Sequence, residues 1–245
     1  MKGDTVMATF VLVHGGGHGG WCWQRLTPYL RRAGHEVYTP TLTGLGERAH
    51  LLGPDVDLDM HIDDVVAVLK YEDLHDVVLV GHSYGGMVIT GVADRAPSRV
   101  GHLVYLDAAT PTDGQSLADV SPDLMEMARS MGKVVDGVEL VLNAMPEAGR
   151  FYGVTDQEAL EWMQGRLTPQ PWRTFEQSLR LTDEQTVRRI PRTDIVCVNP
   201  LGTGNIDVGE RTRGAHRVFE IDTGHDLMIT EPEKVAGFLL ELTSA

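Results

Sequence analysis

The stretch VGHSYGG at residues 80–86 decides how the rest of this chain is interpreted. The apolar run DVVLV leads into it, and the small and apolar residues GGMVITGVAD follow. The pattern predicts a strand, a sharp turn and a helix, with Ser83 in the turn between Gly81 and Gly85. In such a G-x-S-x-G turn the serine backbone is strained and its hydroxyl stands beside the helix N-terminus. We therefore predict that Ser83 is a nucleophile; the alternative is a plain glycine-rich turn.

Segments with strand and helix patterns alternate on both sides of this turn. Apolar, β-branched runs predict the strands, and amphipathic runs predict the helices. The expected strands cover residues 9–15, 36–42, 76–80, 100–108, 193–198 and 217–222, and the expected helices cover residues 23–34, 58–74, 85–97 and 230–242. This order predicts an α/β fold with a mostly parallel, doubly wound sheet and helices on both of its faces.

The alternation breaks between Pro111 and Pro191. That stretch has helical patches rich in Met, Trp and charged residues, but no convincing strand. We expect residues 1–110 and 191–245 to form the core, and residues 111–190 to form a helical cap inserted after the fourth recognisable strand. Ligands bind at the carboxyl ends of the strands in such sheets, so an insertion that leaves from there should roof the site.

A nucleophilic serine needs a general base, and hydrolases with this motif place the histidine last along the chain. His225, in the stretch IDTGHDLMIT, follows the last expected strand and precedes the last expected helix. Among the other histidines, only His14 and His18 are expected on loops at the same edge of the sheet. His82 flanks the serine but points the wrong way on the turn. We therefore predict His225 as the base.

The loop after the first strand, HGGGHGGW at residues 14–21, is suited to hold the negative oxygen that forms during acyl transfer. One donor is expected from the backbone N–H of Tyr84, the residue after the serine, and the other from Gly16 in this loop. Glycines let the backbone approach a substrate closely. A phosphate-binding loop is the competing interpretation, but no Lys-Ser/Thr pair follows and no dinucleotide-binding glycine pattern is well placed.

Composition narrows the classes of partner. The 245 residues include 35 acidic and 21 basic side chains, and the formal net charge of −14 argues against nucleic acid and anionic membranes as partners. The two cysteines, Cys22 and Cys197, fit neither a disulfide framework nor a zinc site. The first residues have no apolar stretch of signal-peptide length and no run approaches the length of a membrane span, so we expect a cytoplasmic protein.

Taken together, these stretches resemble the α/β-hydrolase family, and within it the subgroup of plant methylesterases, (S)-hydroxynitrile lyases and their bacterial esterase relatives. The resemblance covers the core from Thr9 to Leu242 and rests on FVLVHGGGHGGWCW, TLTGLGERAHLL, VVLVGHSYGGMV, LVYLDAATPTDGQSL and DTGHDLMITEPEKVAGFLLEL. In the hydroxynitrile lyases a lysine follows the catalytic histidine, and a threonine follows the first-strand histidine. This chain has Asp226 and Gly15 there, so the resemblance favours ester hydrolysis.

The resemblance leaves the acid of the catalytic triad open between two residues. The family usually places this acid just after the strand that follows the cap, where this chain has Asn199 and Pro200. Asp107, at the end of the fourth expected strand, can also reach the histidine, and some hydrolases of this fold use that position. We predict Asp107 as the acid, with Asp207 as the alternative.

The predicted activity is that of a serine hydrolase that cleaves a small, largely apolar carboxylic ester through an acyl-enzyme, without a metal or organic cofactor. The candidate pocket residues are Gly15, Trp21, Met125 and Trp162, because Met and aromatic side chains suit adaptable apolar sites. The alternatives are a lyase or C–C bond hydrolase that acts on a cyanohydrin or a ring-cleavage product, and a small-molecule receptor on the same fold. The sequence leaves the oligomeric state open, with a homodimer as one option.

Overall fold

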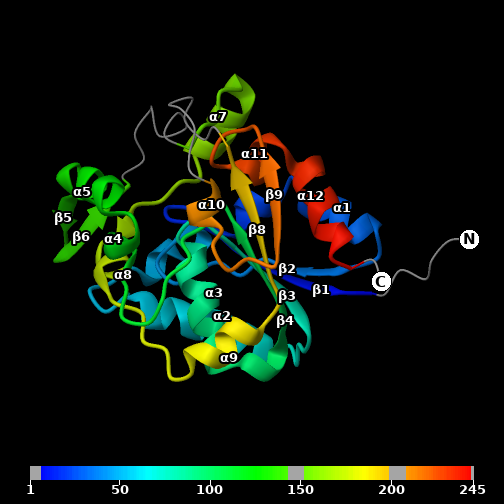
Figure 1. The fold of residues 1–245 in the computed structure, drawn as a ribbon. Helices are drawn as coiled ribbons and strands as arrows, with labels where there is room; N and C mark the ends of the chain where they lie inside the picture. Colours follow the sequence, from blue (N-terminus) through cyan, green and yellow to red (C-terminus); the bar gives the residue numbers. More distant parts are fainter. Residues whose placement is uncertain (1–6, 143–151, 199–207, 244–245) are drawn as a thin grey trace, which may run out of the picture.

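The computed structural model describes residues 7–142, 152–198 and 208–243 of the chain (Figure 1). Its main sheet has the strand order β2-β1-β3-β4-β8-β9, and every neighbouring pair in it runs parallel. These strands are β1 (Thr9–Val13), β2 (Glu36–Tyr38), β3 (Val77–His82), β4 (Val100–Leu106), β8 (Arg192–Cys197) and β9 (Arg217–Ile221). The predicted parallel α/β sheet is therefore confirmed.

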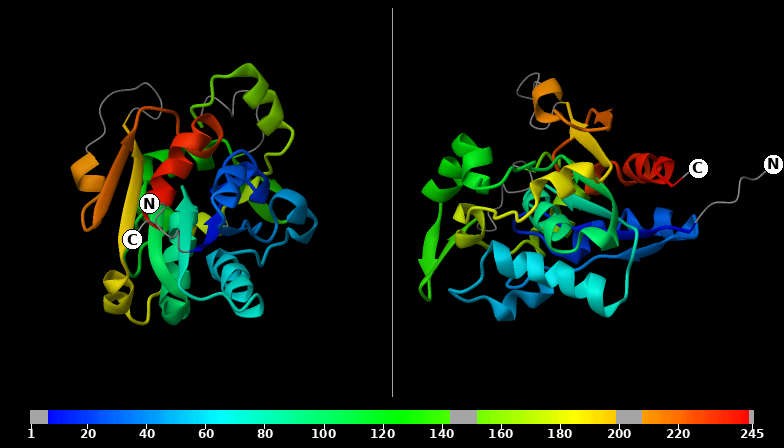
Figure 2. Two further views of the ribbon diagram at one scale, coloured as in Figure 1. Left: turned by 90° about the vertical axis from the view of Figure 1, so that its right-hand side faces the viewer. Right: turned by 60° about the horizontal axis from the view of Figure 1, so that its bottom comes forward.

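Helices cover both faces of this sheet, as the views in Figure 2 show. Alternate strand residues point to opposite faces, so Val11 packs with α2 and α3, whereas Phe10 packs with α1 and α12. The helices of the core are α1 (Thr27–Arg32), α2 (Leu58–Tyr71), α3 (Gly85–Arg95), α9 (Glu184–Arg189), α10 (Val208–Arg211), α11 (Leu227–Thr230) and α12 (Pro232–Glu241). Short 3-10 turns occupy Gly20–Trp23, Gly46–Leu51 and Pro97–Arg99. Within the described ranges, none of the helices combines the length and apolarity needed to cross a membrane.

Most of the predicted elements are shorter in the structure. The first strand ends at Val13 instead of residue 15, and the helix expected over residues 23–34 spans Thr27–Arg32. The second strand was expected to reach residue 42 but ends at Tyr38, since Pro40 has no N–H with which to continue a strand ladder. The closing helix was expected from residue 230 but begins at Pro232, because residues 227–230 form the separate short helix α11. None of these changes moves the predicted site residues away from the carboxyl ends of β1, β3, β4 and β9.

The insertion after β4 contains strands as well as helices, so the expectation of a cap without strands was wrong. A small antiparallel sheet in it is ordered β5-β6-β7. Asp136 and Gly137 join β5 to β6 with φ angles of 49° and 82°, a turn in which both residues are left-handed and which Asp-Gly pairs favour. The elements are α4 (Leu117–Val120), α5 (Pro122–Ser130), β5 (Lys133–Val135), β6 (Val138–Val141), α7 (Gln157–Gln164), β7 (Gln170–Pro171) and α8 (Arg173–Glu176).

The insertion and the helix that ends it lie in different parts of the molecule. Figure 1 shows α4, α5, β5 and β6 on the side of the molecule away from both chain termini. Helix α9 lies instead beside α3, and its Val187 belongs to the same buried cluster as Val88 of α3. The segment between β4 and β8 therefore both builds the cap and returns to cover one face of the sheet.

Candidate active site

Ser83 lies in the tight turn between β3 and α3. Its φ is +53°, in the left-handed region that residues with a side chain rarely adopt, so the backbone is strained at the serine. The two flanking glycines are required by close packing. A Cβ on Gly81 would lie 2.6 Å from the Gly85 carbonyl oxygen, and one on Gly85 would lie 2.7 Å from the Val13 carbonyl oxygen. The turn thus has the strain and the close packing that the G-x-S-x-G pattern predicts.

Asp107 occupies the matching position on the neighbouring strand. In the register of β3 and β4, His82 is opposite Leu106, so Ser83 and Asp107 are each the next residue beyond a paired end. Asp107 is buried and also has a positive φ, 45°. Its Oδ1 accepts a hydrogen bond from the Cys197 N–H at 3.2 Å, which ties the carboxylate to the end of β8.

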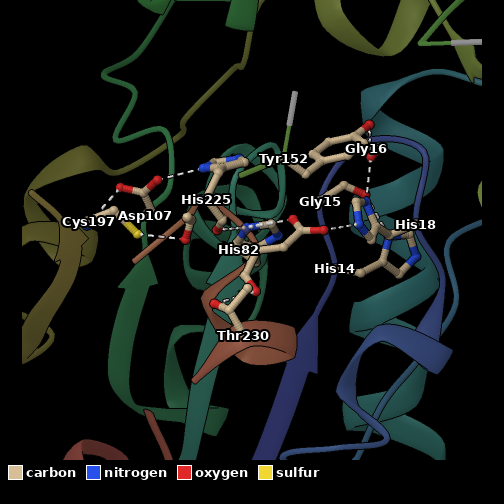
Figure 3. Close-up of polar contacts among 12 residues, drawn as sticks. His14, Gly15, Gly16, His18, His82, Asp107, Tyr152, Cys197, His225 and Thr230 are labelled. Carbon is tan, nitrogen blue, oxygen red and sulfur yellow. Dashed lines mark hydrogen bonds and ion pairs between the residues drawn. The ribbon is translucent and has the colours of Figure 1, made fainter. Parts of the chain in front are cut away.

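His225 follows β9 and meets Asp107. The His225 Nδ1 lies 2.5 Å from the Asp107 Oδ2 (Figure 3). The carboxylate is almost fully buried, whereas 21% of the His225 side chain is exposed. A carboxylate bound at Nδ1 fixes the tautomer and the orientation of an imidazole, as a triad requires. The structure therefore brings together two of the predicted residues; the alternative acid, Asp207, lies outside the described residues.

His82 supports His225 from beside the serine. Its Nε2 donates to the backbone carbonyl oxygen of His225 at 3.0 Å, and the two ring centroids are 4.7 Å apart. Burial lowers the pKa of His82 to about 3, and the nearby His225 acts in the same direction. His82 is thus neutral near pH 7 and supplies a donor instead of a charge. No signal in the sequence could predict this contact, because its acceptor is a backbone atom far along the chain.

The glycine loop after β1 lies against Ser83. A Cβ on Gly15 would be 2.8 Å from the Ser83 Cβ, so a larger residue does not fit there without a shift. The Gly15 carbonyl oxygen accepts from His14 Nδ1 at 2.8 Å and from the His18 N–H at 3.4 Å. Because C=O and N–H point in opposite directions across a trans peptide, this anchoring directs the Gly16 N–H to the other side. The predicted oxyanion donor thus belongs to a peptide that two hydrogen bonds orient.

His14 takes part in this loop as a neutral ring. Its Nε2 accepts a hydrogen bond from the Leu42 N–H at 3.1 Å, so the proton must be on Nδ1, which donates to Gly15. Burial lowers the pKa of His14 to about 3, in agreement with this tautomer. His14 was predicted only to lie at the active edge of the sheet; the structure gives it a contact that shapes the loop.

Tyr84, whose N–H is the other predicted oxyanion donor, is the residue that precedes α3. Its side chain is buried and its hydroxyl donates to His61 Nδ1 at 2.9 Å. His61 donates in turn from Nε2 to the Thr43 carbonyl oxygen at 2.9 Å, and burial lowers its pKa to about 4. These bonds fix the residue after the serine at the positive end of the α3 dipole.

The predicted pocket residues have different surroundings. Trp21 stacks on His18 with centroids 5.3 Å apart, and it meets Trp162 edge-on at 5.2 Å, so both tryptophans pack the glycine loop. Met125 is buried in the cluster that also contains Tyr84. Gly15, as described above, adjoins Ser83.

Two apolar residues that the sequence did not single out lie at the predicted oxyanion donor. A Cβ on Gly16 would be 2.8 Å from the Phe175 ring and 3.0 Å from the Leu142 side chain. Both come from the insertion, Leu142 just after β6 and Phe175 from α8. Their distance from the core motifs along the chain explains why no local pattern indicated them.

Asp226, which replaces the lysine of the hydroxynitrile lyases, is fully buried. Its Oδ2 lies 2.9 Å from the Nε2 of His18. Burial alone would raise the pKa of this carboxyl, but the charge and hydrogen bond of His18, with further effects from His82 and His225, lower it below its ordinary value. Asp226 is therefore an anion held next to His225 in the chain, where those lyases have a cation.

Comparisons with known proteins identify the family of the chain. A family model described as the alpha/beta hydrolase family matches residues 10–238. The carbendazim hydrolyzing esterase of Nocardioides sp. (strain SG-4G) is 45% identical over 183 residues, which cover 71% of this chain and 74% of that protein. An alpha-hydroxynitrile lyase of Arabidopsis thaliana is 34% identical over 124 residues, covering 50% of this chain and 48% of that protein.

The similarity extends to solved structures. An extracellular α/β-hydrolase from a Paenibacillus species, described as sharing structural and functional homology with the tobacco salicylic acid binding protein 2, has a TM-score of 0.78 with this chain. The two are 26% identical, and the superposition covers 97% of this chain and 99% of the other. The match therefore includes the insertion as well as the sheet.

Proposed function

The chain belongs to the α/β-hydrolase family, and from this premise we propose that it is a serine esterase that cleaves a small, largely apolar carboxylic ester through an acyl-enzyme. The observation that carries the proposal is the 2.5 Å contact between His225 Nδ1 and Asp107 Oδ2, at the sheet edge where the strained Ser83 follows β3. A strained serine turn together with a carboxylate-bound histidine at one edge is the arrangement that acyl transfer requires.

The proposed cycle assigns one role to each residue. Ser83 attacks the ester carbonyl while His225 takes its proton, and Asp107 stabilises the charged imidazole. The N–H groups of Gly16 and Tyr84 bind the oxyanion of the tetrahedral intermediate. His225 then gives its proton to the departing alcohol, which leaves an acyl-enzyme. A water molecule activated by the same histidine releases the acid and restores the serine.

The surroundings of Gly16 support an apolar substrate. Phe175 and Leu142 lie where a side chain on Gly16 would be, so a substrate bound at this N–H meets an aromatic and an aliphatic group. The relative that is 45% identical is named for carbendazim hydrolysis, which makes carbendazim a substrate to test beside simple esters. Small acyl groups on an activated leaving group are the first compounds to try.

A cyanohydrin lyase is the rival that the relatives raise, since one of them is an alpha-hydroxynitrile lyase. The position that carries a lysine in those lyases holds here the anion of Asp226, which is buried and bound to His18. Asp226 cannot supply the positive charge with which that lysine stabilises a departing cyanide ion. This contact favours ester hydrolysis over the lyase reaction.

The test compares the purified protein with its Ser83→Ala variant on p-nitrophenyl acetate, p-nitrophenyl butyrate and carbendazim. We expect hydrolysis of at least one ester by the wild type, and a loss of roughly 10⁵-fold or more in the variant, because the nucleophile is removed. Circular dichroism of both proteins checks that the variant is folded. Activity retained in Ser83→Ala, or a folded wild-type protein without activity on any ester, would overturn the proposal.

A further inference from the structure

His18 lies fully buried between the glycine loop and the residue after His225. Its Nδ1 is 2.7 Å from the Gly16 carbonyl oxygen, and its Nε2 is 2.9 Å from Asp226 Oδ2 (Figure 3). Neither side chain of the His18–Asp226 pair is exposed at all. One ring therefore connects the loop that carries the predicted oxyanion donor with the loop that carries the predicted base.

The two hydrogen bonds of His18 define where its protons are. A carbonyl oxygen can only accept, so Nδ1 must carry a proton, and an ionised carboxylate also accepts, so Nε2 must carry one as well. His18 is then an imidazolium, and its positive charge is paired with the negative charge of Asp226. A buried charge of this kind is tolerated only when it is paired and hydrogen-bonded, as it is here.

The side chain of Asp226 bonds to His18 and does not cap the helix that Asp226 precedes. It stands before α11, where an aspartate often caps the helix, yet its side chain makes no capping hydrogen bond. Its backbone N–H donates to the Tyr152 carbonyl oxygen at 2.9 Å, which holds the residue in place. Its Oδ1 is 3.8 Å from His82 Nε2. The carboxylate is thus directed at histidines, and His18 is its hydrogen-bond partner.

The ring of His18 is enclosed by aromatic side chains. Trp21 stacks on it at 5.3 Å, and Tyr152 meets it edge-on at 4.8 Å. The carbonyl oxygen of Gly16 is held by the Tyr152 hydroxyl at 3.4 Å as well as by His18. On the other side of the same peptide, the Gly17 N–H donates to the Gln170 Oε1 at 2.9 Å.

We propose that His18, as an imidazolium held by Asp226, is a positioning residue for ester hydrolysis, because its Nδ1–H fixes the glycine loop that presents the Gly16 N–H to the oxyanion. Three successive glycines have little conformational preference of their own, so their orientation must come from contacts outside the loop. Groups that stabilise a transition state act through their fixed geometry, and a displacement of about 1 Å can lower the rate by about 10²-fold. This inference rests on the proposed function.

The test uses two variants that are nearly equal in size and differ in hydrogen bonding. Asp226→Asn is present in both, so that no buried carboxylate is left without its partner. The first variant adds His18→Asn, whose amide nitrogen stands where Nδ1 stood and can still donate to the Gly16 carbonyl oxygen. The second adds His18→Leu, which has the shape of Asn but no donor.

We expect kcat for p-nitrophenyl butyrate to be about 10²-fold lower in His18→Leu/Asp226→Asn than in His18→Asn/Asp226→Asn, with KM values within about threefold of each other. Active-site titration with a phosphonate reagent would normalise both rates to the amount of competent enzyme. Equal kcat values in the two variants, or a difference confined to KM, would overturn the inference. A residue that only supports folding would change the amount of active protein and not its kcat.

A second measurement needs no variant that folds poorly. Nitrogen-15 spectra of the histidine rings in the wild-type protein at pH 7 should show a proton on both nitrogens of His18. A His18 ring with one bare nitrogen would overturn the assignment of the ion pair. A wild-type protein that hydrolyses no ester would overturn the proposed function, whereas wild-type activity with equal rates in the two variants would overturn this inference alone.

Discussion

The molecule contains two buried histidine–aspartate pairs that differ in what the second ring nitrogen does. In the His225–Asp107 pair the carboxylate takes Nδ1, and part of the ring is exposed. In the His18–Asp226 pair the carboxylate is hydrogen-bonded to Nε2, a carbonyl oxygen accepts from Nδ1, and neither side chain is exposed. An imidazole that already donates from both nitrogens cannot accept a proton from a serine. The same two residue types can therefore serve as a base in one place and as a positioning element in another.

Chain connectivity ties these two pairs together. His225 and Asp226 are consecutive residues, and their side chains bind partners from two distant parts of the sequence. Asp107 is 118 positions before His225, and His18 is 208 positions before Asp226. His82 joins them from the serine turn by its bond to the His225 carbonyl oxygen. A substitution in one pair is thus expected to affect the other pair, because both pairs share the loop that contains His225 and Asp226.

The largest expected effect comes from removing the base. His225→Ala should lower kcat/KM for p-nitrophenyl esters by roughly 10⁵-fold or more, because the serine then has no group to take its proton. The free energy of unfolding should also fall, by about 1–3 kcal/mol, because the buried Asp107 carboxylate loses its imidazole partner and keeps the bond from the Cys197 N–H. Steady-state kinetics and urea unfolding on the same preparation measure both. A small decrease in kcat/KM would mean that His225 is not the base, and the functional difference between the two histidine–aspartate pairs would not hold.

The next effect separates the two candidate acids. Asp107→Asn should lower kcat by roughly 10³- to 10⁴-fold, because an amide cannot stabilise the charged imidazole and selects the wrong tautomer. Asp207→Asn is the matched control and should leave kcat within about threefold. The opposite ranking would assign the acid to Asp207 and leave Asp107 as a structural ligand of the ring.

Removing one partner of the other pair should lower the stability of the protein in addition to its kcat. His18→Ala leaves the Asp226 carboxylate buried without its partner and should lower the free energy of unfolding by about 3–5 kcal/mol. Asp226→Ala should do the same, and the double variant should be more stable than the sum of the two losses predicts. Urea unfolding of the wild type, the two single variants and the double variant gives the coupling free energy between the two side chains. Additive losses would show that the two side chains do not interact.

A further effect concerns the three buried histidines whose pKa is strongly lowered. The native pKa is about 3 for His14 and His82 and about 4 for His61, against an ordinary value of 6.5. Between about pH 4 and 6.5 the unfolded chain therefore binds more protons than the native protein. The free energy of unfolding should fall as the pH is lowered through that range, by at most about 1.4 kcal/mol per pH unit for each ring.

This pH dependence can be checked by urea unfolding at pH 7.5, 6.0 and 5.0. His61→Gln should reduce the slope by about one proton, because the amide can replace both hydrogen bonds of the ring but does not titrate. If the free energy of unfolding of this variant depends on pH as it does in the wild type, His61 has the same pKa in the native and the unfolded protein.

Local patterns predicted most of the sheet and missed the strands in the insertion. The runs that became β1, β3 and β4 are apolar and end in residues with a clear role, which makes them easy to identify. The hairpin of β5 and β6 carried a signal that was overlooked, the Asp136-Gly137 pair between two valine-rich segments. The contact of Phe175 and Leu142 with Gly16 carried none, because no periodicity in the insertion shows which of its side chains faces the core.

The parallel sheet, the strained turn at Ser83 and the position of His225 after the last strand could all be predicted from the amino-acid sequence. Each of these depends on residues that are close together along the chain, where periodicity and glycine placement restrict the backbone directly. The choice of Asp107 as the partner of His225 and the pairing of His18 with Asp226 could not be settled from the sequence and are seen in the folded structure alone. Those contacts join residues that are more than a hundred positions apart. The local sequence around an aspartate does not show which buried imidazole it will reach, because the crossing of the strands and loops decides that.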